Sequence, residues 1–200
     1  YQTDIQRQYE KLNGYVYTEP YDIEYERNGV LTYDRRDKIF GYEDVAYGGD
    51  MSISDLNQPN YVGVDIDPAL KAAPGSQYTA PVVAMNWSGA PLENPVLKWR
   101  FDATDIYGNY ITTGKSGEVP MDFAPYTREQ HDISFSLPSQ KCVGTFTVWI
   151  ENNGEKIAKN FVNVIVTNGK DTAPVSILTE DSAVLRQAAA DSNTIQNGVG

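Results

Sequence analysis

Apolar and polar residues alternate along residues 96–103, strictly so from Leu97 onward, and this is the clearest pattern in the chain. Leu97, Trp99 and Phe101 occupy one set of alternate positions, and charged residues such as Lys98 occupy the other. Because successive side chains of a β-strand point to opposite faces, this period of two predicts a strand with one buried face. The same criterion predicts strands at residues 61–66, 78–87, 96–103, 110–113, 131–137, 143–150 and 161–167.

The predicted strands number about seven over about 107 residues, with a turn signal roughly every eight to twelve residues. This spacing is typical of an immunoglobulin-like β-sandwich, so we expect a mainly β fold. Asn153 and Gly154, between the last two strands, are the residue pair that favours a type I′ turn. Residues 114–130 hold prolines and glycines and are predicted to form a longer excursion.

The chain has a single cysteine, Cys142, which excludes an internal disulfide. Trp99 falls in the third predicted strand, where immunoglobulin-like sandwiches keep a core tryptophan. No cysteine pair brackets it, so a disulfide-bonded immunoglobulin domain is excluded. Cys142 flanks a predicted strand, and we expect a buried, inert thiol.

The first sixty residues follow a different pattern. Residues 3–12 are predicted to be helical, because apolar residues at i, i+4 and i+7 form one stripe: Ile5, Tyr9 and Leu12. A short apolar strand is predicted at Gly14–Tyr17, and Pro20 ends it because proline has no backbone donor. Residues 20–34 are predicted to be a long loop or a broken helix, and residues 43–60 a connection.

Patterning weakens after residue 170. Residues 174–178 indicate one more strand, residues 183–190 a short helix, and residues 191–200 a tail or the start of a further domain. We therefore divide the chain into three predicted domains: residues 1–58, the sandwich at 59–170, and a linker or further domain at 171–200.

Composition restricts the function classes. The chain has 200 residues, a formal net charge of −11 and 40% hydrophobic residues, which suits a globular protein. The negative charge repels phosphates and anionic lipid, so we expect neither nucleic acid nor membrane as a partner. No apolar run is long enough to cross a bilayer, and no signal peptide is visible at the start. With one histidine, no phosphate-binding loop and no Gly-x-Ser-x-Gly motif, we expect no metal site and no cofactor.

Residues 14–38 carry a recognisable series of motifs. Gly14-Tyr-Val-Tyr17 is followed by an acidic loop, then by Asn28-Gly29-Val30, then by Asp34-Arg-Arg-Asp-Lys38. This order resembles the last strand and closing loop of the catalytic barrel in glycoside hydrolase family 2, the β-galactosidases and β-glucuronidases. The resemblance covers about the first sixty residues and implies that they are a helix–strand–loop remnant of a (β/α)8 barrel.

In this family the catalytic pair is two glutamates on earlier barrel strands. The resemblance therefore implies that the chain carries no catalytic residue and is inactive alone. Tyr17 matches an aromatic residue that lines the sugar subsite, and Glu19 and Asp22 in the acidic loop are further candidates for substrate binding. Asp34 and Arg35 are predicted to be structural, as a helix N-cap and its ion-pairing arginine.

Taken together, these features lead us to expect that the chain is a portion of a family 2 glycoside hydrolase that acts on β-linked sugars. The chain would supply a subsite wall and an accessory sandwich, with carbohydrate and the other domains of the parent as partners. We expect a periplasmic or secreted parent whose signal peptide is not in this chain. The alternative is a non-catalytic carbohydrate-binding or adhesin-like β-sandwich module, which predicts a row of exposed aromatic residues on one sandwich face.

Overall fold

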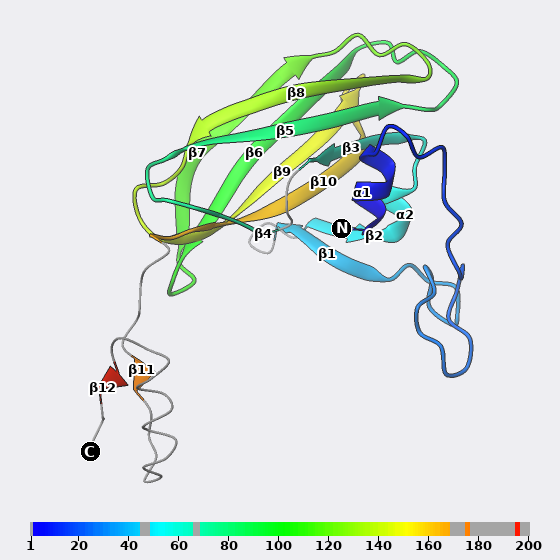
Figure 1. Cartoon of the computed structure of the whole chain (residues 1–200). Coiled ribbons are helices and arrows are strands. Elements are labelled where there is room, and N and C mark those ends of the chain that lie inside the picture. Colours follow the sequence, from blue (N-terminus) through cyan, green and yellow to red (C-terminus); the bar gives the residue numbers. More distant parts are fainter. Residues whose placement is uncertain (1, 45–48, 66–68, 169–174, 177–194, 197–200) are drawn as a thin grey trace.

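The structure is a computed structural model that describes residues 2–44, 49–65, 69–168, 175–176 and 195–196. Two short helices and a pair of antiparallel strands precede the main β unit (Figure 1). They are α1 (Gln2–Gln8), β1 (Ile39–Asp44), β2 (Gly49–Ser52) and α2 (Ile53–Leu56). None of the described helices is long and apolar enough to cross a membrane.

Eight strands then form two sheets, and they run from Asn60 to Val166: β3 (Asn60–Val64), β4 (Ala69–Ala72), β5 (Gln77–Asn86), β6 (Pro95–Asp105), β7 (Tyr110–Pro120), β8 (Thr127–Ser136), β9 (Cys142–Asn152) and β10 (Glu155–Val166). One sheet has the order β4-β10-β9-β6-β7 and the other the order β3-β5-β8. All neighbours are antiparallel except β4 and β10, which are parallel. Figure 1 shows the two sheets facing each other. The prediction of a mainly β chain built on a sandwich is confirmed.

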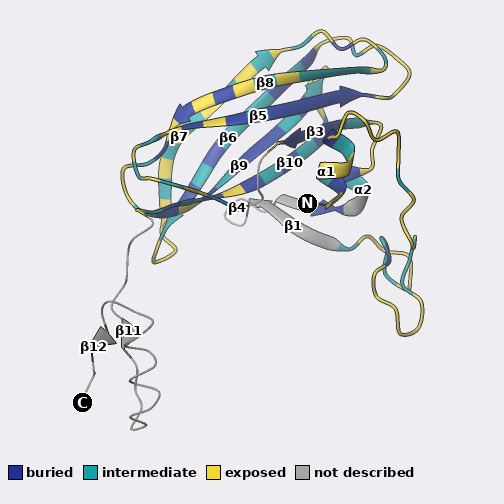
Figure 2. Cartoon of the chain, in the orientation of Figure 1, coloured by how far each residue is buried: buried dark blue, intermediate teal, exposed yellow. Residues whose placement is uncertain are grey.

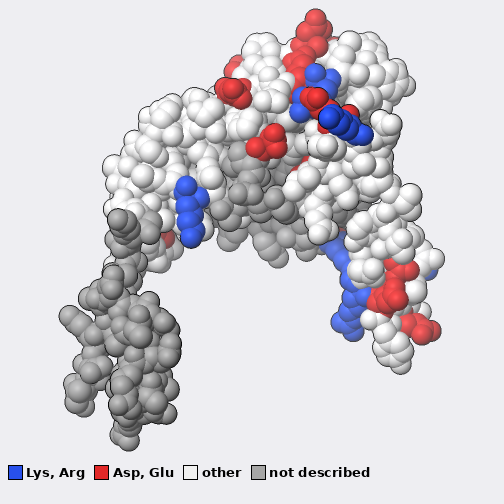
Figure 3. Space-filling view, in the orientation of Figure 1, with Lys and Arg blue, Asp and Glu red and all other residues white. Residues whose placement is uncertain are grey.

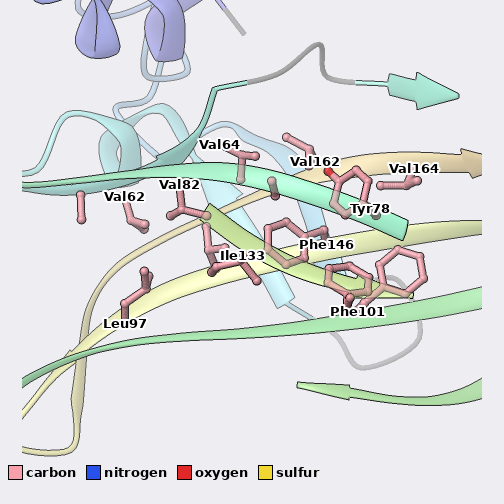
Figure 4. Close-up of a cluster of buried hydrophobic side chains, with 14 of the residues drawn as sticks. Val62, Val64, Tyr78, Val82, Leu97, Phe101, Ile133, Phe146, Val162 and Val164 are labelled. Carbon is pink, nitrogen blue, oxygen red and sulfur yellow. The ribbon is translucent and has the colours of Figure 1, made fainter. Parts of the chain in front are cut away.

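The core lies between the two sheets and is built by the alternate positions of their strands (Figure 4). Phe135 of β8 stacks on Trp99 of β6 and on Phe146 of β9, at centroid distances of 5.1 and 5.5 Å. Phe101 is fully buried over Gly144, where an added Cβ would come within 2.0 Å of its ring. Each large buried side chain contributes about 1.5–3 kcal/mol to stability.

Helices α1 and α2, which precede β3, lie on the outer side of the sandwich beside β3 and β10, and the long loop between them projects away (Figure 2). Val83 and Met85 of β5 point away from the main core, yet both are buried, because Met51 and Leu56 lie against them in a second apolar cluster with Tyr61. This cover explains why β5 is buried on both faces over its second half.

Helix α1 is joined to the sandwich by polar contacts centred on Tyr61. The buried Tyr61 hydroxyl donates to Asp4 Oδ1 at 2.8 Å and accepts from Gln8 Nε2 at 3.0 Å. Asn160 Nδ2 also donates to Asp4 Oδ1, at 2.7 Å. Arg7 lies over the Tyr61 ring, 4.6 Å from its centroid. The helix is thus held by its polar face.

The helix prediction was only partly right. Helix α1 ends at Gln8, and the predicted apolar stripe of Ile5, Tyr9 and Leu12 stays exposed. The reason is the Tyr61 network: it places Asp4 and Gln8 against the sandwich, so the stripe lies at the side of this contact and its side chains stay about half exposed.

The predicted strand over Gly14–Tyr17 is wrong. These residues are irregular, and no described strand pairs with them. Side chains anchor the segment instead: the Tyr15 hydroxyl bonds to Asn57 Oδ1, and the Tyr17 hydroxyl to the Asn28 carbonyl. A strand needs a ladder partner on at least one edge. The barrel remnant predicted for residues 1–58 is therefore not confirmed.

Other expectations are corrected in detail. The connection over 43–60 holds part of the β1–β2 hairpin and the whole of α2, and the excursion over 114–130 is largely the end of β7 and the start of β8. Strand β4 has no alternating pattern and was not predicted. Residues 20–34 are a loop, as expected. Within the strand predicted at 174–178, the structure describes the two-residue strand β11 (Val175–Ser176), which pairs with β12 (Ile195–Gln196). The helix predicted at 183–190 lies outside the described residues.

Two local predictions are confirmed. Asn153 and Gly154 have φ angles of 53° and 82°, the positive pair that a type I′ turn requires. Cys142 is buried, and this burial raises the pKa of its thiol, which keeps it protonated and unreactive.

Candidate functional site

The acidic loop, residues 17–38, is organised around the short stretch Asn28–Val30. The Val30 N–H donates to the Glu19 carbonyl at 3.1 Å, and the Tyr17 hydroxyl donates to the Asn28 carbonyl at 2.7 Å. The Gly29 N–H donates to Asp22 Oδ1 at 3.0 Å. The three predicted substrate-binding residues, Tyr17, Glu19 and Asp22, therefore all contact one stretch of backbone.

Gly29 is required there by packing. A Cβ added at Gly29 would lie 2.2 Å from the Tyr21 carbonyl carbon and 2.3 Å from the Asp22 nitrogen. The two chain segments can approach each other only because this position has no side chain. The Asn28-Gly29 motif is thus a structural element of the loop.

Asp22 is engaged by a basic partner. Lys38 Nζ lies 2.6 Å from Asp22 Oδ1, and their side chains are 28% and 15% exposed. Lys38 Nζ also donates to the Arg27 carbonyl at 2.8 Å. The pair joins the start of the loop to its end, 16 residues later. The carboxylate of Asp22 is used mainly in holding the loop, and its role in substrate binding stays a prediction.

Tyr17 and Glu19 differ in what they present. The Tyr17 ring is about half exposed. Glu19 has one buried carboxylate oxygen, Oε1, which has no hydrogen-bond partner within the described part of the chain. The peptide bond between Thr18 and Glu19 is cis. Tyr17 offers a ring face and Glu19 an acceptor, but their role in substrate binding is untested.

A second group of loop residues was missed by the sequence analysis. The Arg35 guanidinium lies 3.7 Å from the centroid of the Tyr21 ring, which is a close cation–π contact. A hollow of about 600 Å³ opens beside this pair. It is lined by Tyr21, Ile23, Glu24, Tyr25, Glu26, Tyr33 and Arg35. The number of tyrosines between residues 15 and 33 was the available signal for such a hollow.

The expected role of the Asp34-Arg35 pair is wrong. No helix starts at Asp34; the residue lies in a turn. Its carboxylate accepts from the Thr32 hydroxyl at 2.6 Å and pairs with Arg36 Nε, also at 2.6 Å. These contacts lower the pKa of Asp34. Arg36 is therefore the ion-pairing arginine, and Arg35 is the one that stacks.

Charges of both signs lie side by side on the loop (Figure 3). No group of three or more His, Cys, Asp or Glu side chains among the described residues is placed to hold a metal ion. The one histidine, His131, is far from the loop in sequence and lies on β8, where its Nε2 is 2.8 Å from Glu129 Oε2. What the loop offers chemically is ring faces, carboxylates and one stacked guanidinium.

No family model matches the chain, and no curated protein matches it either. Among solved structures it is similar to a family 123 glycoside hydrolase from Clostridium perfringens, at 10% identity and TM-score 0.40, over 50% of this chain and 23% of that chain. A glycosyl hydrolase family 2 member from Bacteroides cellulosilyticus matches at 13% identity and TM-score 0.32, over 54% of this chain and 14% of that chain.

The CARDB domain of a Pyrococcus furiosus protein is similar to the same degree, at 11% identity and TM-score 0.37, over 55% of this chain and 96% of that domain. The chain spans less than a quarter of the length of the two glycoside hydrolases. Identities and TM-scores this low assign neither a family nor a function. Glycoside hydrolases are among the structural neighbours, alongside domains of other kinds.

Proposed function

We propose that the chain is the C-terminal part of a family 2 glycoside hydrolase that cleaves β-linked sugars. In this proposal the loop over residues 17–38 forms a wall of the sugar subsite, and the sandwich is an immunoglobulin-like accessory domain. The catalytic glutamates lie elsewhere in the parent, so the chain alone is inactive. The parent is periplasmic or secreted, and this is checked by cell fractionation.

The observation that carries the proposal is the exposed, unpaired segment Gly14–Tyr17, which leads into the loop. Val16 is 96% exposed, Tyr17 is about half exposed, and no described strand pairs with Gly14–Tyr17. Parallel barrel strands are apolar because they are buried on both faces. The neighbouring strands and outer helices of a barrel would cover the exposed Val16 side chain.

The motif residues support the proposal in a second way. Gly29 allows the two segments of the loop to approach, Lys38 fixes Asp22, and Arg36 fixes Asp34. These positions belong to the series that resembles the family 2 motifs. Their contacts stabilise the shape of the loop, and this role is the same whichever sugar the parent binds.

The sandwich is consistent with the accessory role. Its three-on-five strand order, with Trp99 packed on Phe135 in the core, fits an immunoglobulin-like unit without a disulfide. We assign Tyr17 to stacking on a sugar ring and Glu19 to accepting a hydroxyl. Asp22 contributes by holding the loop that carries both.

The test compares this chain with a longer protein that includes the upstream coding sequence. Both are assayed on p-nitrophenyl β-galactoside and β-glucuronide. We expect hydrolysis by the longer protein and none by the chain alone. In the longer protein, Tyr17→Ala should lower kcat/KM by about tenfold or more, and Tyr107→Ala, a change on the sandwich, should not. Turnover by this chain alone, or an upstream sequence without a glutamate pair, would refute the proposal.

The stand-alone binding module is less well supported. It predicts a row of exposed aromatic residues on one sandwich face. Trp87 and Tyr126 are exposed near the end where β6 begins, whereas Tyr107 and Tyr110 are exposed near the other end, where β6 meets β7. The exposed rings therefore do not form one row.

A further inference from the structure

Two aromatic side chains lie exposed together at one end of the sandwich. Trp87 follows β5 and Tyr126 precedes β8, and they are 48% and 66% exposed. Their ring centroids are 6.1 Å apart, with 51° between the ring planes. Large rings of this kind are usually buried, so an exposed adjacent pair points to a binding role.

The backbone that carries the two rings is fixed by Asn86. This side chain is fully buried, and its Nδ2 donates to the carbonyls of Ala90, Phe123 and Ala124. The Tyr126 N–H donates to the Asn86 carbonyl at 2.7 Å. The loop after β5 and the loop before β8 are thus joined, which fixes the backbone positions of both rings before any ligand arrives.

Trp87 also lines a groove between α1 and the sandwich. The groove has a volume of about 560 Å³, which is within the range of small-molecule sites. Tyr9, Leu12 and Trp87 give it apolar walls, and Gln6, Glu10 and Asn13 give it polar groups. The hollow of the acidic loop shares none of these residues.

We propose that this groove binds a neutral saccharide. The Trp87 ring stacks against the apolar C–H face of a pyranose, and the amides of Gln6 and Asn13 bond its hydroxyls. The groove is also lined by Arg7 and Arg128, and the protein itself engages both: Arg128 Nη1 lies 3.1 Å from Glu10 Oε1, and Arg7 Nη1 donates to the carbonyls of Leu56 and Gln58. The net charge of −11 further disfavours an anionic ligand. The site is separate from the loop at residues 17–38, and the inference does not depend on the proposed hydrolase parent.

Proline-rich peptides also bind aromatic grooves, so they are the competing ligand class. A saccharide is favoured because the amides of Gln6 and Asn13 line the same groove as the Trp87 ring, together with the Glu10–Arg128 ion pair. Vicinal hydroxyls can pair with such groups on both sides of a stacked ring. A polyproline helix offers carbonyl acceptors and no donors of its own.

The experiment titrates the full chain with cellohexaose and xylohexaose by calorimetry and tryptophan fluorescence. We expect saturable binding and a change in the emission of Trp87, which is the most exposed of the three tryptophans. Trp87→Ala should weaken binding by about fivefold to tenfold or more. Tyr107→Ala, which removes a more exposed ring at the far end of the sandwich, is the control and should bind like wild type.

Circular dichroism melts establish that both variants fold, and decaproline is titrated in parallel. Absence of saccharide binding by the folded wild type overturns the inference, and so does equal binding by Trp87→Ala. Binding of decaproline in place of the sugars overturns it as well. If Tyr17→Ala abolishes sugar binding and Trp87→Ala leaves it intact, the sugar occupies the loop, and the groove inference fails while the proposed function gains support.

Discussion

The sandwich and the loop over residues 17–38 are stabilised in different ways. The sandwich has continuous ladders, such as the pairing of β5 with β8 along the whole of Gln77–Asn86, and a core of fully buried side chains. The loop has three isolated β-bridges, one partly buried ion pair, and exposed rings such as Tyr25 and Tyr33. A region that completes its own hydrogen bonds and core is a folding unit, and a region held by a few polar contacts is adapted to present side chains.

The largest expected effect is on the sandwich core. Phe101→Ala should lower the free energy of unfolding by about 3–5 kcal/mol, because it leaves a cavity above Gly144. Tyr25→Ala, at the 98% exposed tip of the loop, should change it by less than about 0.5 kcal/mol. Guanidinium denaturation of both variants measures the difference. Similar losses would mean that the loop shares the stability of the sandwich.

A change at Asp22 should open the loop and leave the sandwich intact. Asp22→Ala removes the partner of Lys38 and the acceptor of the Gly29 N–H, with a local cost of about 1–3 kcal/mol. Amide exchange at Gly29 and Val30 should become faster, while exchange in β9 stays the same. Glu26→Ala, which removes an exposed acid from the same loop, should leave these rates unchanged, and an equal effect of both changes would contradict the role given to Asp22.

The attachment of α1 to the sandwich should be weakened by Tyr61→Phe. This change removes one hydroxyl that bonds to Asp4 and Gln8, and the net cost is about 1–2 kcal/mol. Exchange of the α1 amides should rise, and the melting temperature should fall by a few degrees. Tyr107→Phe, on an exposed turn, is the control. An unchanged α1 would show that the contacts of Arg7 and of Asn160 suffice to hold the helix.

The smallest effect is a pH dependence on the outer face of the sandwich. Lys98 lies 2.7 Å from Glu151 and lowers the pKa of that carboxyl, so the pair stabilises the fold above the ordinary pKa of glutamate, about 4.3. This contribution is lost as the pH falls through the lower folded pKa. Glu151→Gln should therefore reduce the loss of stability between about pH 5 and pH 3, by less than about 1 kcal/mol. Denaturation at the two pH values measures it, and a larger acid loss in the variant would reverse the assignment.

Much of the sandwich could be predicted because its strands satisfy a local rule. Leu97 and Phe101 alternate with Lys98 and face the core, and Asn153 forms the expected turn. Strand β4 was missed because its pairing with β10 is set by the sheet edge and not by its own pattern.

The candidate site could be predicted only as a list of residues. That Lys38 meets Asp22, and that Arg35 stacks on Tyr21 while Arg36 pairs with Asp34, depends on how the loop turns. No period in the sequence encodes those turns. The stripe on α1 was misplaced for a similar reason, because the polar contacts of Tyr61 outweigh an apolar pattern of three residues.

The outer edge of the five-stranded sheet has a consequence for how molecules of this protein behave when crowded. Strand β7 has an irregular register opposite Phe101–Ala103, a positive φ at Gly114, charged residues at Lys115 and Glu118, and a proline at its end. A bent, charged edge is a poor template for a strand from another molecule. At high concentration the edge of β7 should therefore resist the sheet-to-sheet growth that leads to fibrils.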